Sequence, residues 1–187
     1  MATKVLGFLF LVLSAFPAFP AEVAGVKIPD TDQQLVLNGA GLRKRAIFQV
    51  YAIGLYLPER KATAAEVIAA TGPRRIAIYM LRDVDADQFS GALADGIKDN
   101  HSEAEAKALE PRVKQLAATM AEMKEAKKGM RIVLDLLPAV GTQLSVDGKP
   151  VGAPIAGDDF HRALLRIWLG DKPVQDDLKK ALLGEKQ

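Results

Sequence analysis

The chain has 187 residues, of which 49% are hydrophobic and 26% are charged, and this composition is typical of a folded globular protein rather than a disordered one. It contains no cysteine, which excludes thiol catalysis, iron–sulfur clusters and cysteine-based zinc sites. The formal net charge is only +2, and basic residues are interleaved with acidic ones along the chain. Because nucleic-acid binding usually requires a concentrated basic surface, we expect no nucleic-acid partner.

The N-terminus has the pattern of a secretory signal peptide. Lys4 precedes twelve uncharged residues, 5–16, and small residues and prolines follow up to Ala21. The apolar run is shorter than the roughly 20 residues that span a bilayer, which argues against the alternative of a membrane anchor. We therefore expect residues 1–21 to be cleaved and residues 22–187 to form one exported domain, periplasmic or secreted, with no membrane span after cleavage.

Two apolar runs with strand-like composition follow one another early in the chain. Residues 34–37 end at Asn38-Gly39, a favoured hairpin turn pair, and residues 46–57 are rich in β-branched and aromatic side chains. We therefore expect a hairpin with its turn at Asn38-Gly39. Alternate side chains of the second run are apolar on both faces, so we expect the sheet to be covered on both sides there.

The rest of the chain alternates between helical and strand-like patterns. The predicted elements are a helix over 63–70, a strand over 75–81, a helix around 86–97, a helix with a capping box at Ser102 and Glu105, strands over 130–137 and 142–146, a hairpin turn at Asp147-Gly148, and two final helices. This order disfavours a parallel β-α-β array. It favours an α+β fold, in which an antiparallel sheet carries a layer of helices on one face.

Metal-binding and catalytic motifs are missing from the sequence. The only two histidines, His101 and His161, are too few for a zinc site and are expected at the surface. The acidic run Asp83-x-Asp85-x-Asp87 lacks the glycine and the glutamate that a calcium loop requires. The glycine-rich and serine motifs of hydrolases, P-loop proteins and dinucleotide-binding proteins are also missing. We expect no metal and no cofactor.

A polar group beside the apolar strands is the remaining candidate site. It consists of Arg43, Arg45, Gln49 and Tyr51, which share one face if the strand pairing is unbroken, whereas a bulge near Gly41 would change this parity. A guanidinium can bind a carboxylate through two parallel hydrogen bonds while an apolar cleft holds the rest of a ligand. The alternative is that the arginines are solvated residues of a turn.

Three segments of the chain resemble the chalcone isomerase family: Gly39–Arg43, Tyr51–Leu57 and, near the C-terminus, Leu169–Lys179. The resemblance covers the mature chain in element order, and the leader suggests the exported bacterial members. It implies an open-faced β-sandwich, with a cleft between a large antiparallel sheet and its helical layer. In the family's plant enzymes this cleft closes a flavanone ring, and an arginine matching Arg43 stabilises the developing charge. Non-catalytic relatives bind fatty acids with the same arginine and a tyrosine.

The same resemblance implies the residues of the site. Tyr51 stands where the enzymes carry threonine, Gln175 where they carry a hydroxyl residue, and Phe89 and Asp95 where a tyrosine and an asparagine are expected. We therefore expect a protein that binds a small apolar carboxylate, such as a fatty acid, in a cleft beside Arg43, and we leave open whether it is an enzyme. Its ligand-binding residues would be Arg43, Tyr51, Arg45, Gln49, Phe89 and Gln175. Two alternatives stay open: an intramolecular lyase or isomerase acting on an unsaturated carbonyl (chalcone-like) compound, with Arg43 and Tyr51 as catalytic residues, or a non-catalytic partner-binding protein.

Overall fold

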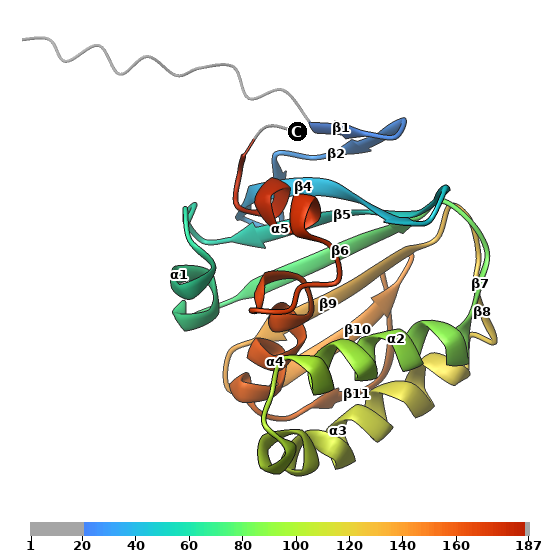
Figure 1. Ribbon diagram of the computed structural model, residues 1–187, viewed down its shortest axis with the longest axis vertical. Coiled ribbons are helices and arrows are strands. Elements are labelled where there is room, and N and C mark those ends of the chain that lie inside the picture. The colour runs from blue at the N-terminus through green and yellow to red at the C-terminus, as the bar shows by residue number, and fades with distance from the viewer. Residues whose placement is uncertain (1–20, 186–187) are drawn as a thin grey trace, which may run out of the picture.

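A seven-stranded antiparallel sheet forms the centre of the computed structural model, which describes residues 21–185 (Figure 1). The strand order across the sheet is β11-β10-β9-β6-β5-β4-β3. In chain order these strands are β3 (Thr31–Asp32), β4 (Leu35–Arg45), β5 (Phe48–Leu57), β6 (Arg74–Met80), β9 (Arg131–Leu137), β10 (Gly141–Val146) and β11 (Lys149–Ile155). Two small pairs accompany them: β1 (Ala21–Val23) with β2 (Val26–Ile28), and β7 (Val84–Asp85) with β8 (Glu125–Ala126). The predicted leader lies outside the described residues, apart from Ala21.

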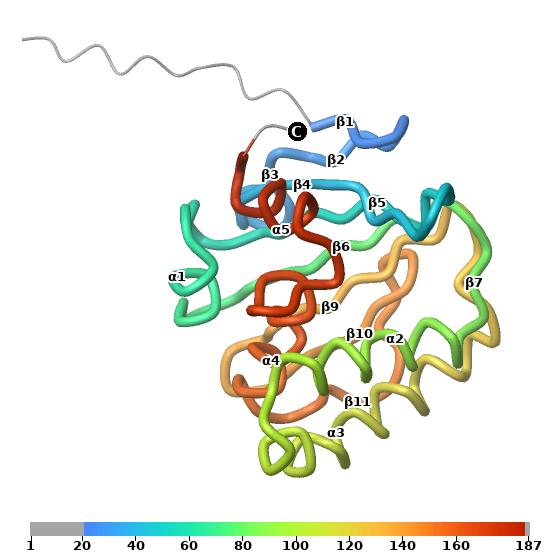
Figure 2. Tube along the Cα trace, viewed as in Figure 1, coloured from blue at the N-terminus to red at the C-terminus, as the bar shows by residue number. Residues whose placement is uncertain are grey.

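Helices cover one face of this sheet, as the trace in Figure 2 also shows. They are α1 (Ala64–Ala69), α2 (Ala86–Asp99), α3 (Glu103–Ala121), α4 (Asp158–Leu169) and α5 (Asp176–Leu182). The predicted capping box begins α3, because the Ser102 side chain accepts from Glu105 N and the Glu105 side chain accepts from Ser102 N. The helix then runs through Pro111 without ending. The predicted α+β architecture, with helices on one face, is confirmed.

Strand β5 is buried on both faces, as its apolar alternation predicts. Tyr51, Ile53, Leu55 and Leu57 belong to the large core under the helices. On the opposite face, Ala52 and Tyr56 pack in a second cluster with Ile28 of β2. The β1–β2 hairpin therefore helps to cover the second face, and the sequence shows this segment only as a short apolar run.

The predicted turn at Asn38-Gly39 is wrong, because β4 continues through both residues and the chain reverses at Ala46-Ile47. The reason is the approach of α5. The Asn38 amide donates to the carbonyl oxygen of Leu182 at 2.8 Å, and a Cβ on Gly39 would lie 2.2 Å from the carbonyl oxygen of Ala181. These residues therefore let a helix end dock on the strand. The turn predicted at Asp147-Gly148 is confirmed, since it joins β10 to β11.

Candidate functional site

A cleft of about 780 Å³ lies where β4 and β5 meet α2 and the segment between α4 and α5. Its apolar lining includes Phe89, Leu93 and Ile167, all of them at most 4% exposed. The volume falls within the range of roughly 300–1,000 Å³ that is usual for small-molecule sites. The fold therefore leaves room for a ligand beside the predicted polar residues.

A bulge in β5 decides which of these residues face the cleft. Arg43 pairs with Tyr51, but the next pair is Lys44 with Gln49, so Val50 is an extra residue without a partner on β4. Between the bulge and the turn, each β5 side chain therefore faces the side opposite to the one that simple alternation from Tyr51 predicts. Gln49 is consequently exposed and does not line the cleft, although alternation alone would place it beside Tyr51. A second register shift lies between Leu37 and Gly39 and leaves Asn38 as an extra residue on β4.

The same shift brings five residues of the hairpin to one side. The hairpin residues that line the cleft are Arg43, Arg45, Phe48, Val50 and Tyr51. Arg45 pairs with Phe48 next to the turn, and Phe48 was not among the predicted site residues. Its part in the cleft depends on the extra residue in β5, which no local pattern in the sequence reveals.

Gln175 lies behind Arg43 rather than in the cleft. It immediately precedes α5, and its Nε2 donates to the carbonyl oxygen of Leu42 at 2.9 Å. Its Oε1 accepts from the backbone N–H of Lys44 at 2.8 Å and from Arg43 Nη1 at 3.3 Å. The amide therefore ties the start of α5 to β4 and holds the guanidinium of Arg43.

Tyr51 is buried, and its hydroxyl accepts a hydrogen bond from Trp168 Nε1 at 2.9 Å. Burial raises the pKa of Tyr51, although the Trp168 hydrogen bond and the nearby Arg43 charge act in the lowering direction. The phenol is therefore neutral near pH 7, and its own O–H can donate to a ligand. The ring of Phe89 packs beside it, with the ring centroids 6.2 Å apart.

Trp168 supports the site through Tyr51, and no motif in the sequence singles it out. It is the single tryptophan of the chain, and a buried indole N–H usually finds a hydrogen-bond acceptor. That expectation was available from the sequence, but the identity of the acceptor was not, because Tyr51 lies 117 positions away.

Arg43 has no carboxylate partner among residues 21–185, since none of the ion pairs there includes it. Arg75, by contrast, pairs with both Asp32 and Asp135. The rest of the cleft lining carries charges of both signs: Arg45, Arg82, Lys172, Asp83, Asp95 and Asp99. The half-buried Arg43 therefore presents a guanidinium without an ion-pair partner to a cleft whose lining is partly apolar and partly charged.

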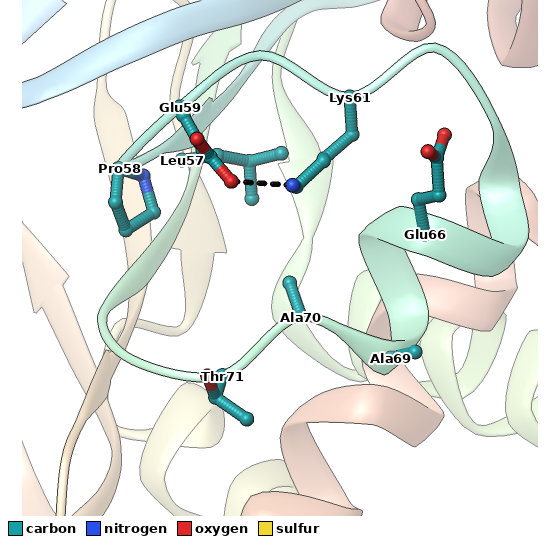
Figure 3. Close-up of a pocket in the computed structure, with 8 residues that line it drawn as sticks. All are labelled: Leu57, Pro58, Glu59, Lys61, Glu66, Ala69, Ala70 and Thr71. Carbon is teal, nitrogen blue, oxygen red and sulfur yellow. Dashed lines mark hydrogen bonds and ion pairs between the residues drawn. The ribbon is translucent and has the colours of Figure 1, made fainter.

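A second hollow lies between the end of β5 and α1, away from the predicted site (Figure 3). Its volume is about 480 Å³, and an ion pair between Lys61 and Glu59 crosses one side of it. None of the predicted site residues lines it. The cleft beside Arg43 is both larger and chemically better matched to a carboxylate.

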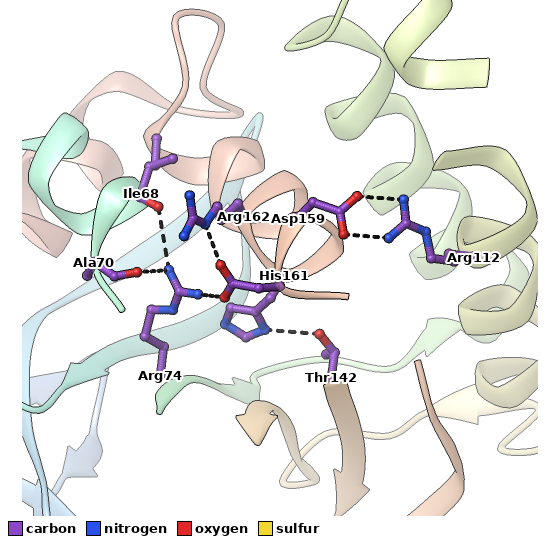
Figure 4. Close-up of polar contacts among 9 residues, drawn as sticks. Ile68, Ala70, Arg74, Arg112, Thr142, Asp159, His161 and Arg162 are labelled. Carbon is purple, nitrogen blue, oxygen red and sulfur yellow. Dashed lines mark hydrogen bonds and ion pairs between the residues drawn. The ribbon is translucent and has the colours of Figure 1, made fainter. Parts of the chain in front are cut away.

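His161 is fully buried, so the prediction of a surface position is wrong (Figure 4). Helix α4 packs against β10 and also against α1, α2 and α5, which buries most of its circumference. The Nδ1 of His161 lies 3.2 Å from Thr142 Oγ1. Burial, and secondarily the charge of Arg74, lower the pKa of His161 to about 3, so the ring is neutral at ordinary pH.

A buried arginine lies in the same polar cluster, outside the cleft. The Arg74 guanidinium donates to Asp158 and to the carbonyl oxygen of Ala70 (Figure 4).

Within residues 21–185 no group of three histidine or acidic side chains could hold a metal ion. No helix in that part of the chain is both long and apolar enough to cross a membrane.

Comparisons with known proteins agree with this architecture. A family model described as chalcone isomerase-like matches residues 20–184. The crystal structure of a fatty-acid binding protein of Arabidopsis thaliana is similar to this one, with a TM-score of 0.65 and 16% sequence identity. The match covers 85% of this chain and 92% of that chain. A sequence comparison with curated proteins finds no relative.

Proposed function

We propose that this chain, which belongs to the chalcone isomerase-like family, binds an aliphatic carboxylate such as a fatty acid in the cleft beside Arg43. One observation carries the proposal: Arg43, unpaired with any carboxylate among the described residues, lines a cleft of about 780 Å³ together with the buried apolar side chains of Phe89 and Leu93. A partly desolvated guanidinium without an anion is unfavourable, and a ligand carboxylate would pair with it through charge-assisted hydrogen bonds. The similar Arabidopsis thaliana structure is that of a fatty-acid binding protein, which supports the same ligand class.

The arrangement assigns a role to each neighbouring group. Arg43 would bind the carboxylate, and the neutral Tyr51 hydroxyl would donate to it while accepting from Trp168. Gln175 would keep the guanidinium in place from behind. The hydrocarbon tail would lie along Phe89 and Leu93, where burial of each CH₂ contributes about 0.8 kcal/mol.

The test compares a long-chain fatty acid with its methyl ester on two proteins, the wild type and Arg43→Gln. Binding can be followed through the single tryptophan, because Trp168 contacts Tyr51 in the cleft wall. Loss of a charged hydrogen bond costs about 1.5–3 kcal/mol, so Arg43→Gln should weaken fatty-acid binding by roughly 10- to 100-fold. The ester should bind both proteins about equally.

Lys107→Gln is the matched control, because it removes one positive charge from an exposed position on α3, away from the cleft. It should leave the affinity for the fatty acid unchanged. Equal affinities of wild type and Arg43→Gln for the acid would overturn the proposal.

A second candidate function is isomerisation of an unsaturated carbonyl compound. The adjacency of Arg43 and the neutral Tyr51 phenol favours it, because both groups can donate to an oxygen on which negative charge develops. Assays with chalcone and simpler enones separate the two functions. Turnover above the uncatalysed rate that is lost in Arg43→Gln would favour the enzyme.

We also propose that the protein is exported after removal of residues 1–21, which the charge and apolar pattern of that leader supports. The intact mass of the protein purified from its own cells measures the cleavage. A chain that begins at Glu22 and is found in the periplasmic or external fraction is the expected result. A full-length chain in the cytoplasmic fraction would contradict it.

A further inference from the structure

The tip of the β4–β5 hairpin, residues 44–48, exposes large apolar side chains. Ile47 is 89% exposed and Phe48 is 52% exposed. The chain reverses at Ala46-Ile47 with a positive φ of 52° at Ala46, a conformation for which glycine, asparagine and aspartate are the usual choices. The turn therefore does not require these residues, and exposure of their large apolar side chains to water is unfavourable.

Positive charge surrounds these two side chains. Lys44 and Arg45 are exposed on the same tip, and the guanidinium carbon of Arg82 lies 4.6 Å from the ring centroid of Phe48. No acidic residue occurs between Asp32 and Glu59 in the sequence. The hairpin is thus a basic segment with an apolar end.

More lysines lie at the same end of the sheet. The exposed Lys127 and Lys128 follow β8, and the backbone N–H of Lys128 donates to the carboxylate of Asp83 at 2.7 Å. That bond connects the β8–β9 loop to the segment that carries Arg82. Figure 1 shows the β4–β5 tip and the β7–β8 pair at one end of the molecule. Acidic residues lie at this end as well, among them Asp83 before the β7–β8 pair, Asp85 and Glu125 within it, Asp87 of α2 and Asp147 of the β10–β11 turn.

The tip also lines the cleft through Arg45 and Phe48, beside Arg82. Exposed apolar side chains flanked by cations are the features by which segments bind at the surface of an anionic bilayer.

We propose that this tip docks the protein on a lipid bilayer with anionic headgroups, with Ile47 and Phe48 at the interface and the basic residues on the headgroups. The docked orientation would place the cleft opening at the membrane surface. The inference rests on the exposed tip and its charges, so it stands apart from the identity of the cleft ligand.

Vesicle binding of the full mature protein tests the proposal. Wild-type protein should co-sediment with phosphatidylcholine vesicles that contain phosphatidylglycerol, and should not do so with vesicles of phosphatidylcholine alone. Ile47→Asp should reduce this partitioning at least tenfold. Lys44→Gln should reduce it by about fivefold at low salt, and added salt should remove that difference.

Val140→Asp is the matched control. Val140 is a β-branched side chain, 52% exposed, on the turn between β9 and β10 at the opposite end of the sheet. It should leave vesicle binding unchanged. Circular dichroism checks that both aspartate variants are folded.

Three results would overturn the proposal: no preference for anionic vesicles, equal losses in Ile47→Asp and Val140→Asp, or a wild-type dimer that Ile47→Asp dissociates. Fatty-acid affinity measured without vesicles keeps the two proposals distinguishable. Ile47 does not line the cleft, so Ile47→Asp should bind the acid as the wild type does while losing the vesicles.

Discussion

Trp168 Nε1 donates a hydrogen bond of 2.9 Å to the hydroxyl of Tyr51, and this contact joins the last part of α4 to the centre of β5. Both side chains are buried, so the bond forms where water cannot replace it. Because the Tyr51 oxygen already accepts this bond, its O–H stays available to donate to another group. The bond also links the helical layer to the strand that carries the site.

Replacing Trp168 with phenylalanine should test this link. The variant removes the indole N–H and leaves a smaller ring in the core, so we expect a loss of about 2–4 kcal/mol in the free energy of unfolding from packing and hydrogen bonding together. Urea unfolding measures it. In a double-mutant cycle with Tyr51→Phe, the two losses should add to more than the loss of the double variant. Strict additivity would show that the bond contributes nothing.

Gln175→Ala should loosen Arg43 without touching the ligand. The change removes Gln175 Oε1, which accepts from Arg43 Nη1 and Lys44 N. It also removes Gln175 Nε2, which donates to the carbonyl oxygen of Leu42. Because Arg43 itself remains, fatty-acid affinity should fall by less than in Arg43→Gln, by roughly tenfold or less. Titration calorimetry on the two variants gives the comparison, and a loss as large as that of Arg43→Gln would assign Gln175 a direct contact.

Gly39→Ala should destabilise the protein because the strand has no space there. The new Cβ would lie 2.2 Å from the carbonyl oxygen of Ala181, a backbone atom of α5, so the helix must shift. We expect a loss of roughly 1–3 kcal/mol or more in thermal or urea unfolding.

Gly91→Ala is the control for this substitution. Gly91 is exposed within α2 and has no atom within 4 Å of an added Cβ. The change should stabilise the protein by about 0.5–1 kcal/mol, because alanine loses less backbone entropy in a helix. Two alanines with effects of the same sign would refute the assigned reason.

The pH dependence of stability should carry a contribution from His161. Its folded pKa of about 3 lies below the value of about 6.5 in the unfolded chain, so the unfolded state binds the extra proton between these values. Stability from this group is complete above about pH 6.5 and is lost as pH falls towards 3. At pH 5 the loss should be about 2 kcal/mol.

His161→Gln removes the titrating ring and should flatten the change in unfolding free energy between pH 7 and pH 5. His101→Gln is the comparison variant, because it makes the same replacement at a partly buried position. A slope that is the same in all three proteins would show that His161 does not titrate in this window.

Much of the fold follows from local patterns. The alternation of β5 predicts a strand covered on both faces, and the capping box at Ser102 predicts the start of α3. Asp147-Gly148 predicts a turn because aspartate and glycine are among the few residues that accept a positive φ. Each of these signals comes from neighbours in the chain, so the sequence alone carries it.

The Asn38-Gly39 pair shows where such reasoning ends. The local preference for a turn was overridden by the docking of α5, which needs a glycine for close approach and an amide for the Leu182 carbonyl. His161 shows the same limit, since its burial depends on four separate elements that pack around α4. Contacts between distant segments decide both cases.

By itself the sequence determined the order of the main strands and helices and their apolar faces, and it marked Arg43 and Tyr51 as candidate site residues. Only the tertiary structure decided which residues share the cleft with them. One extra residue in β5, Val50, moves Gln49 away and brings Phe48 in, because a single insertion reverses the side-chain parity of a strand. Trp168 reaches the same site only because α4 packs across the sheet.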